Sequence, residues 1–359
     1  MPYCRRCGTK LDETAYFCYK CGTPVALPYA YLPPPPPKPQ VPLRKDPVIV
    51  MAIVLVSILL ASVFVAILLS APFATINIEQ TYQDNTANID TLNLNFQSSA
   101  AKVTIFTQKI NDNNFLIAID GQASKGMFNG ETGNPIALTT YNDTEDGVLT
   151  VTFILEESTA FSRLTVDCTI YVNPELKLSL NVTSKAGQVS LTADKEATFQ
   201  NLNLQSSAGQ VQANLQNATI EGNLSLKTQA GRVDFRVSQV KVEGNNTITL
   251  QANTGSINMD INETKTLQGN LYVNAITDLG SINLDLAVDS GVAAKVTSQT
   301  SLGSIHVTQK NFSGSQSPIQ SNNYPDQSNI EINNKTNLGS ININANYQSA
   351  TSARANNRN

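Results

Sequence analysis

Residues 201–237, NLNLQSSAGQVQANLQNATIEGNLSLKTQAGRVDFRV, decide the fold of most of this chain. Two glycines in this stretch, Gly209 and Gly231, lie 22 positions apart, and each is followed by a valine two residues later. Apolar and polar residues alternate on both sides of each glycine, which is typical of strands with one buried face. The stretch therefore predicts two β units that turn at a glycine, where a side chain would clash.

The same pattern recurs through the C-terminal three quarters of the chain. Its glycines are Gly187, Gly209, Gly231, Gly255, Gly280, Gly303 and Gly339. Their spacings are 22, 22, 24, 25, 23 and 36, and a copy without the glycine, SSAAKVTI, occupies residues 98–105. A fixed period of this size indicates stacked structural units. We expect a mainly β domain over residues 75–346, wound as a right-handed β-helix or a similar β-solenoid. A β-sandwich is the alternative, although it does not need such regular spacing.

The histidine of this sequence falls inside the repeat. His306 occupies the same slot as a set of polar residues in the other units: Ser190, Gln212, Asp234, Asn258, Asn283 and Asn342. This slot alternates with the buried positions and so faces outward, where stacked side chains form a polar ladder. We therefore expect His306 to be a ladder residue without a catalytic role.

Residues 107–180 depart from the repeat. An Asp146-Gly147 pair between two alternating runs predicts a hairpin. The acidic residues before that turn leave Ca²⁺ binding open as an alternative. Alternation over residues 163–172 predicts that Cys168 is a buried core thiol. Residues 309–328 are polar, contain two prolines and predict a loop, and residues 347–359 read as a disordered tail.

An uncharged apolar segment, Pro47–Leu69, precedes the repeats. A helix of this length spans roughly 33 Å, enough to cross a bilayer core of about 30 Å, and predicts a transmembrane helix over residues 46–70. A cleaved signal peptide is the alternative. Lys38, Arg44 and Lys45 precede the segment, and the next basic residue is Lys102. The positive-inside rule then predicts a cytoplasmic N-terminus, with residues from about 71 onward outside the cell.

Four cysteines lie in two CxxC pairs within residues 1–27. Cys4, Cys7, Cys18 and Cys21 suit a tetrahedral thiolate site and predict structural Zn²⁺, with iron and disulfides as alternatives. So short a segment buries little apolar surface, so metal binding must supply its folding free energy. Because all four ligands are cysteines, no coordination position remains for catalysis.

A proline-rich linker over residues 28–45 follows, with five consecutive prolines at 33–37. Polyproline II makes it a semi-rigid spacer, and a proline-motif ligand for a partner domain is the alternative.

Composition narrows the range of functions. The net charge is −4, and the positive N-terminal part leaves about −8 on the remainder, which argues against nucleic acid as a partner. One histidine and no tryptophan lower the expectation of acid–base catalysis or of a sugar-binding platform. Sequons that permit glycosylation without indicating it stand at Asn142, Asn181, Asn217, Asn223, Asn245, Asn262, Asn311 and Asn334.

Two parts of the chain resemble known families. MPYCRRCGTKLDETAYFCYKCGTPV resembles the N-terminal zinc-ribbon module of many archaeal and bacterial membrane proteins. FSRLTVDCTIYVNPELKLSLNVTSKAGQVSL with the Gly-Ser-Ile-Asn repeats resembles the toastrack, or putative-adhesin, β-repeat family over roughly residues 90–345. The second resemblance implies an extracytoplasmic β-solenoid-like domain linked to adhesion or envelope-stress assemblies, with no defined catalytic residues.

Together these observations predict a single-pass protein of the cell membrane. We expect a non-enzymatic adhesion, scaffold or binding module at the cell surface, whose partners are the lipid bilayer, a protein or surface polymer outside, and a cytoplasmic protein at the zinc ribbon. The alternative is an envelope sensor that couples the outer domain to the zinc ribbon.

Overall fold

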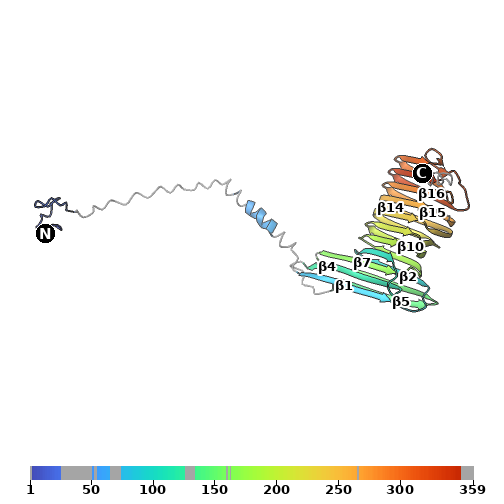
Figure 1. Cartoon of the computed structure of the whole chain (residues 1–359), viewed down its shortest axis with the longest axis horizontal. Helices are drawn as coiled ribbons and strands as arrows, with labels where there is room; N and C mark the ends of the chain where they lie inside the picture. Colours follow the sequence, from blue (N-terminus) through green and yellow to red (C-terminus); the bar gives the residue numbers. More distant parts are fainter. Residues whose placement is uncertain are drawn as a thin grey trace, which may run out of the picture. The chain divides into compact units, whose positions relative to one another are not determined.

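The computed structural model describes residues 2–25, 51, 55–64, 74–125, 134–158, 161, 163–264 and 267–348. The chain divides into two compact units, Met1–Ser62 and Val63–Asn359 (Figure 1). The linker predicted at residues 28–45 lies outside the described residues, as do residues 349–359 of the predicted tail.

Only part of the predicted transmembrane segment is described. Met51 and residues 55–64 are helical, and the rest of residues 46–70 lies outside the described residues. Within the described residues, no helix has both the length and the apolar character that a membrane crossing requires.

The second unit is built mainly from parallel strands that pair in register. Two strands, one on each side of a sharp corner, make a rung, and in two cases a single long strand runs through the corner. In chain order the rung strands are β2 (Thr91–Ser98), β3 (Lys102–Thr107), β6 (Val148–Glu157), β7 (Arg163–Val172), β8 (Lys177–Ser184), β9 (Val189–Ala193), β10 (Thr198–Ala208), β11 (Val211–Gln216), β13 (Leu224–Ser238), β14 (Lys241–Glu263), β15 (Gln268–Leu279), β16 (Ile282–Asp289), β17 (Ala293–Leu302), β18 (Ile305–Lys310), β21 (Asn329–Leu338) and β22 (Ile341–Gln348). A short strand, β12 (Thr219–Ile220), pairs with β10 and β14. These parallel pairings differ from the antiparallel ladders of a β-sandwich.

The repeated glycines form one column at the corners of the rungs. A Cβ placed on Gly231 would lie 1.9 Å from the carbonyl oxygen of Gly209, and one on Gly255 would lie 1.7 Å from that of Gly231. The φ angle of Gly231 is 151°, a conformation that residues with a side chain rarely adopt. The glycine-free copy joins the same column, because a Cβ on Gly187 would lie 2.3 Å from the carbonyl oxygen of Ala101. The sequence prediction of stacked glycine corners is therefore confirmed.

A second column, of hydroxyl groups, lies beside the glycines. The side chain three residues before a corner glycine donates a hydrogen bond to the carbonyl oxygen of the glycine in the neighbouring rung. The pairs are Ser206 to Gly187 at 2.7 Å, Thr228 to Gly209 at 3.1 Å, Thr277 to Gly255 at 3.3 Å, Thr336 to Gly280 at 3.2 Å and Thr300 to Gly339 at 3.2 Å. Ser184 bonds the carbonyl oxygen of Ala101 in the same way, at 3.1 Å. These hydroxyls satisfy buried polar groups at the corner, where an unpaired carbonyl would cost free energy.

The rungs do not stack in simple chain order, which corrects the expectation that successive units pile up one after another. The column runs from Ala101 through the glycines to Gly280, then to Gly339, and ends at Gly303. The reason is that β21 pairs with both β15 and β17, and β22 pairs with both β16 and β18, so the last rung of the chain is inserted between its two predecessors.

The beginning of the domain repeats this insertion. Strand β2 pairs with β6 and β8, and β3 pairs with β7 and β9. The first rung of the chain is therefore inserted between the second and the third. Both chain ends of the stack are thus held on two sides, which opposes fraying of the terminal strands.

Additional antiparallel strands cover the first end of the stack. Strand β5 (Ile136–Glu145) pairs with β6 through the Asp146-Gly147 turn, which confirms the predicted hairpin. Strand β4 (Phe115–Lys125) pairs with β7, and β1 (Ala74–Asp84) pairs with β4. The segment predicted as a loop at 309–328 contains two short strands, β19 (Phe312–Ser313) and β20 (Ile319–Ser321), and β20 pairs with β17. The segment is therefore not a loop throughout, because two short strands with antiparallel pairing interrupt its turns.

The core is one continuous cluster of Ile, Val, Leu and Phe side chains inside the rungs. Cys168 belongs to this cluster and is 1% exposed, as predicted, and burial raises the pKa of its thiol. Strand β22 continues to Gln348, and Tyr347 is buried, so ordered structure extends two residues past the predicted boundary at 346.

Candidate metal centre and polar ladders

Two copies of the sequence CxxCGT build the N-terminal site. In the first, the Cys4 N–H donates to the carbonyl oxygen of Thr9 and the Gly8 N–H donates to that of Cys4, each at 2.9 Å. In the second, Cys18 and Gly22 make the same bonds with Thr23 and Cys18, at 2.9 and 2.8 Å. Gly8 and Gly22 have φ angles of 68° and 70°, so glycine fits the turn that closes each loop.

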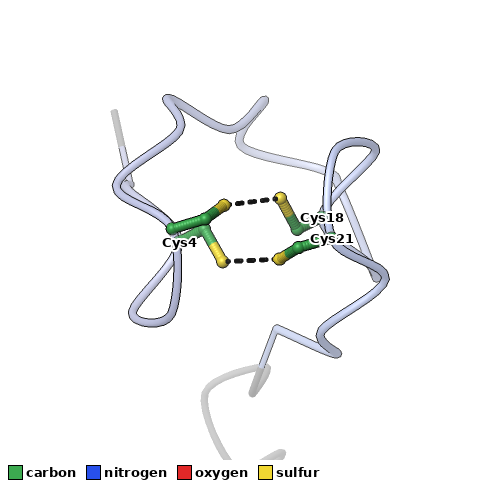
Figure 2. Close-up of side chains that lie close together, drawn as sticks. Cys4, Cys18 and Cys21 are labelled. Carbon is green, nitrogen blue, oxygen red and sulfur yellow. Dashed lines mark hydrogen bonds between the residues drawn. The ribbon is translucent and has the colours of Figure 1, made fainter.

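The two loops bring four sulfurs together. The Sγ atoms of Cys4, Cys7, Cys18 and Cys21 all lie within 4.8 Å of one another. The Sγ atoms of Cys4 and Cys21 are 3.5 Å apart (Figure 2), and those of Cys7 and Cys18 are 3.6 Å apart. Four thiolates at the usual Zn–S distance of about 2.3 Å lie roughly 3.8 Å from one another at the corners of a tetrahedron. The cluster fits structural Zn²⁺, and among the described residues it is the one group of potential ligands that converges in this way.

Two threonines support the cysteines and were missed by the sequence interpretation. The Thr9 hydroxyl lies 3.2 Å from Cys7 Sγ, and the Thr23 hydroxyl lies 3.2 Å from Cys21 Sγ. Their hydrogen bonds lower the pKa of Cys7 and lower that of Cys21 to about 6, whereas burial raises the pKa of Cys18 to about 11. The signal was present in the sequence, as a threonine two positions after the second cysteine of each pair.

The rest of the N-terminal segment offers little apolar burial. Leu11 packs with Cys4 and Cys18, while Tyr3, Tyr16, Phe17 and Tyr19 are exposed. So small a core cannot stabilise a fold alone, so the zinc ion supplies the folding free energy when bound.

The outward slot of the repeat forms the predicted polar ladder. Asn258 Nδ2 donates to Asp234 at 2.6 Å, Asn283 Nδ2 donates to Asn258 at 2.8 Å, and Asn342 Nδ2 donates to Asn283 at 2.8 Å. His306 is exposed and stands opposite Asn342 in the next strand, and its Nε2 lies 2.9 Å from the Ser304 hydroxyl. His306 therefore lies in the outward slot, as the sequence predicted, and the structure adds that this slot is at the end of the ladder.

The strands before the corner carry their own ladder. Asn203 Nδ2 donates to Asn181 at 2.8 Å, and Asn181 Nδ2 donates to Asn95 at 3.3 Å. Further along the stack, Asn333 Nδ2 donates to Asn274 at 3.2 Å. Parallel pairing without register shift brings identical side chains into line, so amides from distant parts of the chain form regular rows.

A polar cleft of about 550 Å³ lies along the side of the stack that includes β12. Its walls are formed by Glu196, Thr198, Asn217, Thr219, Gln239, Val240, Lys241 and Gln268. These side chains come from four successive rungs, so the cleft depends on the same stacking. The sequence interpretation did not identify it, because its residues lie outside the glycine motif on which that interpretation depended.

Comparisons with known proteins agree with the metal centre. A family model described as a zinc-ribbon domain matches residues 3–25. The comparison with curated proteins gives no match. Among solved structures, the chain is similar to a putative cell adhesion protein from Clostridium sporogenes ATCC 15579, with 11% identity and a TM-score of 0.39 over 75% of this chain and 100% of the other. It is also similar to a putative adhesin from Bacteroides fragilis NCTC 9343, with 16% identity and a TM-score of 0.34 over 75% of this chain and 97% of the other.

Proposed function

We propose that this protein is a single-pass membrane protein whose β-rich domain acts outside the cell as a non-enzymatic adhesion, scaffold or binding module. In this proposal residues 46–70 cross the membrane, the zinc ribbon is cytoplasmic, and the stack is wound as a right-handed β-solenoid. The in-register parallel rungs and the single glycine column support the solenoid.

The observation that carries the binding role is the continuous outward ladder from Asp234 to Asn342. Asn258 and Asn283 both donate and accept along the row, and Asn342 donates at its end, which fixes the rotamers of these amides and leaves further donor and acceptor positions for a ligand. A surface whose groups are already fixed loses little entropy when a partner binds. Such rows suit a partner with its own repeating polar groups, such as a surface polymer or an extended protein segment.

Two side chains that could supply nucleophilic or acid–base chemistry are placed unfavourably for it. Cys168 is buried with a raised pKa, so it is protonated at neutral pH, and His306, although it bonds to the Ser304 hydroxyl, is exposed to water on the outer face of the stack. These placements support the inference that the protein is not an enzyme.

The membrane topology is tested by labelling intact cells with a membrane-impermeant maleimide. Ser301→Cys and Thr14→Cys each replace an exposed residue, one on the stack and one in the zinc ribbon. We expect Ser301→Cys to be labelled in intact cells and Thr14→Cys only after the membrane is opened. Labelling of Thr14→Cys in intact cells, or of neither variant before lysis, would refute the topology.

The binding role is tested by measuring how the purified full chain adheres to cells of its own source. Asn283→Arg places a long charged side chain in the middle of the outward ladder, and Asn181→Arg does the same in the row before the corner. We expect Asn283→Arg to reduce adhesion at least tenfold while the control Asn181→Arg keeps it. Equal adhesion of wild type and both variants contradicts the ladder as the binding surface.

The alternative function, an envelope sensor, is favoured by one observation on the cytoplasmic module. Tyr3, Tyr16, Phe17 and Tyr19 are 63%, 64%, 64% and 82% exposed on a very small fold. Exposed aromatic side chains are frequent anchors of protein interfaces. A zinc-dependent cytoplasmic partner that is lost in the Tyr19→Ser variant would support this alternative.

A further inference from the structure

The two ends of the stack are protected to different degrees. At the first end, β5 covers β6, and β4 with β1 covers β7. The Glu157 carboxylate also accepts hydrogen bonds from the Ser99 and Ala100 N–H groups, at 2.8 and 3.0 Å. These N–H groups belong to the corner without a glycine, at the first end of the corner column. The Glu157 side chain therefore satisfies the backbone donors at that end.

The opposite end, drawn in orange and red in Figure 1, is only half covered. Strand β20 pairs with the outer side of β17 at two positions, Lys295 and Val296. Strand β18 pairs with β22 on one side, and no strand among the described residues pairs with its other side. The edge from Ile305 to Lys310 is therefore open within the described part of the chain.

Burial changes at the same place. Ile341 and Ile343, one rung inside the stack, are 0% and 3% exposed. Their neighbours in β18, Ile305 and Val307, are only partly buried, and Leu302 beside the last corner is 66% exposed. The core thus ends with a partly covered apolar row.

The backbone at this edge is oriented toward solvent at defined positions. The Ile341 N–H donates to the Ser304 carbonyl oxygen at 2.9 Å, so Ser304 faces β22. Because successive residues of a strand direct their backbone groups to opposite sides, Ile305, Val307 and Gln309 direct theirs to the open edge. An added strand would bond to these three residues.

We propose that this edge binds a second copy of the same chain, with the two β18 strands antiparallel about a two-fold axis at His306. This inference rests on the proposed adhesive function and names a partner for it. Two copies of the protein would be joined by the ends of their stacks. In this register Ile305 lies opposite Val307 of the other copy. The two half-covered core residues then cover each other, and both direct their backbone groups across the interface as an antiparallel pair requires.

The charges at this edge are compatible with a second copy as the occupant. Residues 290–325 contain no Asp or Glu, and Lys295 stands over the Tyr324 ring, 5.6 Å from its centroid. Lys310 is the charged side chain of β18, and in this register the two Lys310 residues are eight positions apart, roughly 27 Å at about 3.4 Å per residue, so they do not repel.

Single cysteine substitutions in the full chain, added to its five native cysteines, test the register. The His306 pair lies on the axis, at a position without backbone hydrogen bonds, where Cα atoms of antiparallel strands are about 4.5 Å apart, so His306→Cys permits a disulfide. Thr308→Cys, the matched control on the same exposed face, would separate its two Cα atoms by roughly 14 Å, too far for a disulfide. We expect His306→Cys to form disulfide-linked dimers under mild oxidation, whereas Thr308→Cys and the wild type, which associate only non-covalently, should run as single chains on a denaturing non-reducing gel. Equal crosslinking of both variants, or of neither, overturns the proposal.

A second variant blocks the edge without changing the fold. Val307→Pro removes a backbone N–H that points to the open edge, where proline is tolerated. We expect the wild type to sediment as a dimer at concentrations where Val307→Pro, with an unchanged circular dichroism spectrum, sediments as a monomer. A wild type that stays monomeric at about 100 μM would overturn the proposal. Because crosslinking and sedimentation need no membrane, they decide the pairing separately from the topology labelling that decides the proposed function.

Discussion

The Ser206 hydroxyl donates a 2.7 Å hydrogen bond to the carbonyl oxygen of Gly187, across the boundary between two rungs. The same oxygen occupies the space that a Cβ on Gly209 would need, 2.3 Å away. The glycine and the hydroxyl therefore act together: the missing Cβ lets the carbonyl point to the next rung, and the hydroxyl satisfies it there. The pattern Ser/Thr-x-x-Gly is the local unit of the stack.

Removal of one of these hydroxyls should destabilise the domain. Thr228→Val keeps the volume but deletes the donor to Gly209, which leaves a buried carbonyl with one partner fewer. We expect a loss of about 1–3 kcal/mol in the free energy of unfolding, measured by urea denaturation of the full chain. Thr249→Val, on the outward side of the adjacent rung, serves as the control with an expected change below about 0.5 kcal/mol. An equal effect of both substitutions would show that the column of hydroxyl groups beside the corner glycines has no special role in stability.

One rung lacks the hydroxyl by nature and allows the reverse experiment. Ala252 stands between Thr228 and Thr277 in register, three residues before Gly255. Ala252→Ser should donate to the Gly231 carbonyl oxygen and raise the free energy of unfolding by about 0.5–1.5 kcal/mol. Destabilisation by more than about 1 kcal/mol would indicate that the site has no room for a donor.

Substitution of a corner glycine should be far more harmful than substitution of a glycine in open space. Gly231→Ala places a Cβ 1.9 Å from a backbone oxygen, whereas Gly244, with φ of 82°, has no atom within 4 Å of the added Cβ. We expect Gly244→Ala to cost about 1–2 kcal/mol, because left-handed backbone disfavours alanine. Gly231→Ala should cost several kcal/mol more or prevent folding, as seen by circular dichroism and soluble yield. Similar losses for both variants would contradict the close stacking of the corners.

Metal removal should affect only the N-terminal unit. Because the zinc ribbon has a minimal core, a strong chelator should unfold residues 2–25 while the strand signal of the stack in circular dichroism remains. The untreated protein should contain one zinc ion per chain by elemental analysis. Thr23→Val, which removes the hydroxyl 3.2 Å from Cys21 Sγ, should weaken zinc affinity roughly 10–100-fold in a competition assay. Unchanged affinity would show that the threonines do not support the ligands.

The structure also separates the eight sequons by access. Asn142 and Asn262 are exposed, whereas Asn334 is 2% exposed and bonds to Ser298 at 3.2 Å. In a host that glycosylates Asn-x-Ser/Thr, mass spectrometry of the folded protein should find glycan on the first two and none on Asn334. Glycan on Asn334 would mean that this rung is open when the enzyme acts.

The sequence predicted the features that depend on local spacing. The zinc ligands, the corner column, the outward position of His306 and the burial of Cys168 all follow from fixed offsets between residue types. The column of hydroxyl groups had an equally regular signal, a Ser or Thr three residues before most corner glycines, which the sequence interpretation overlooked. Features that alternate or repeat within one unit can be inferred from that unit alone.

The rung order could not be inferred in this way. Every rung presents an apolar edge of the same period, so the strands near Gly339 fit beside Gly280 or beside Gly303 equally well by pattern. The 36-residue gap before Gly339 gave the chain the length to pass the last rung and return, but spacing alone does not show that it does so. The choice depends on which edges are left open by the whole stack, and this is tertiary information.

The most direct test of the stack is therefore a pair of engineered disulfides in the full chain. Asn283→Cys with Asn342→Cys joins residues that are adjacent in register although 59 positions apart. Asn283→Cys with His306→Cys joins units consecutive in the chain that the structure separates by two strand spacings, roughly 9.6 Å, beyond the reach of a disulfide. We predict an intramolecular disulfide in the first double variant and none in the second. The reverse result would contradict the inserted rung and, with it, the architecture on which the outward ladder depends.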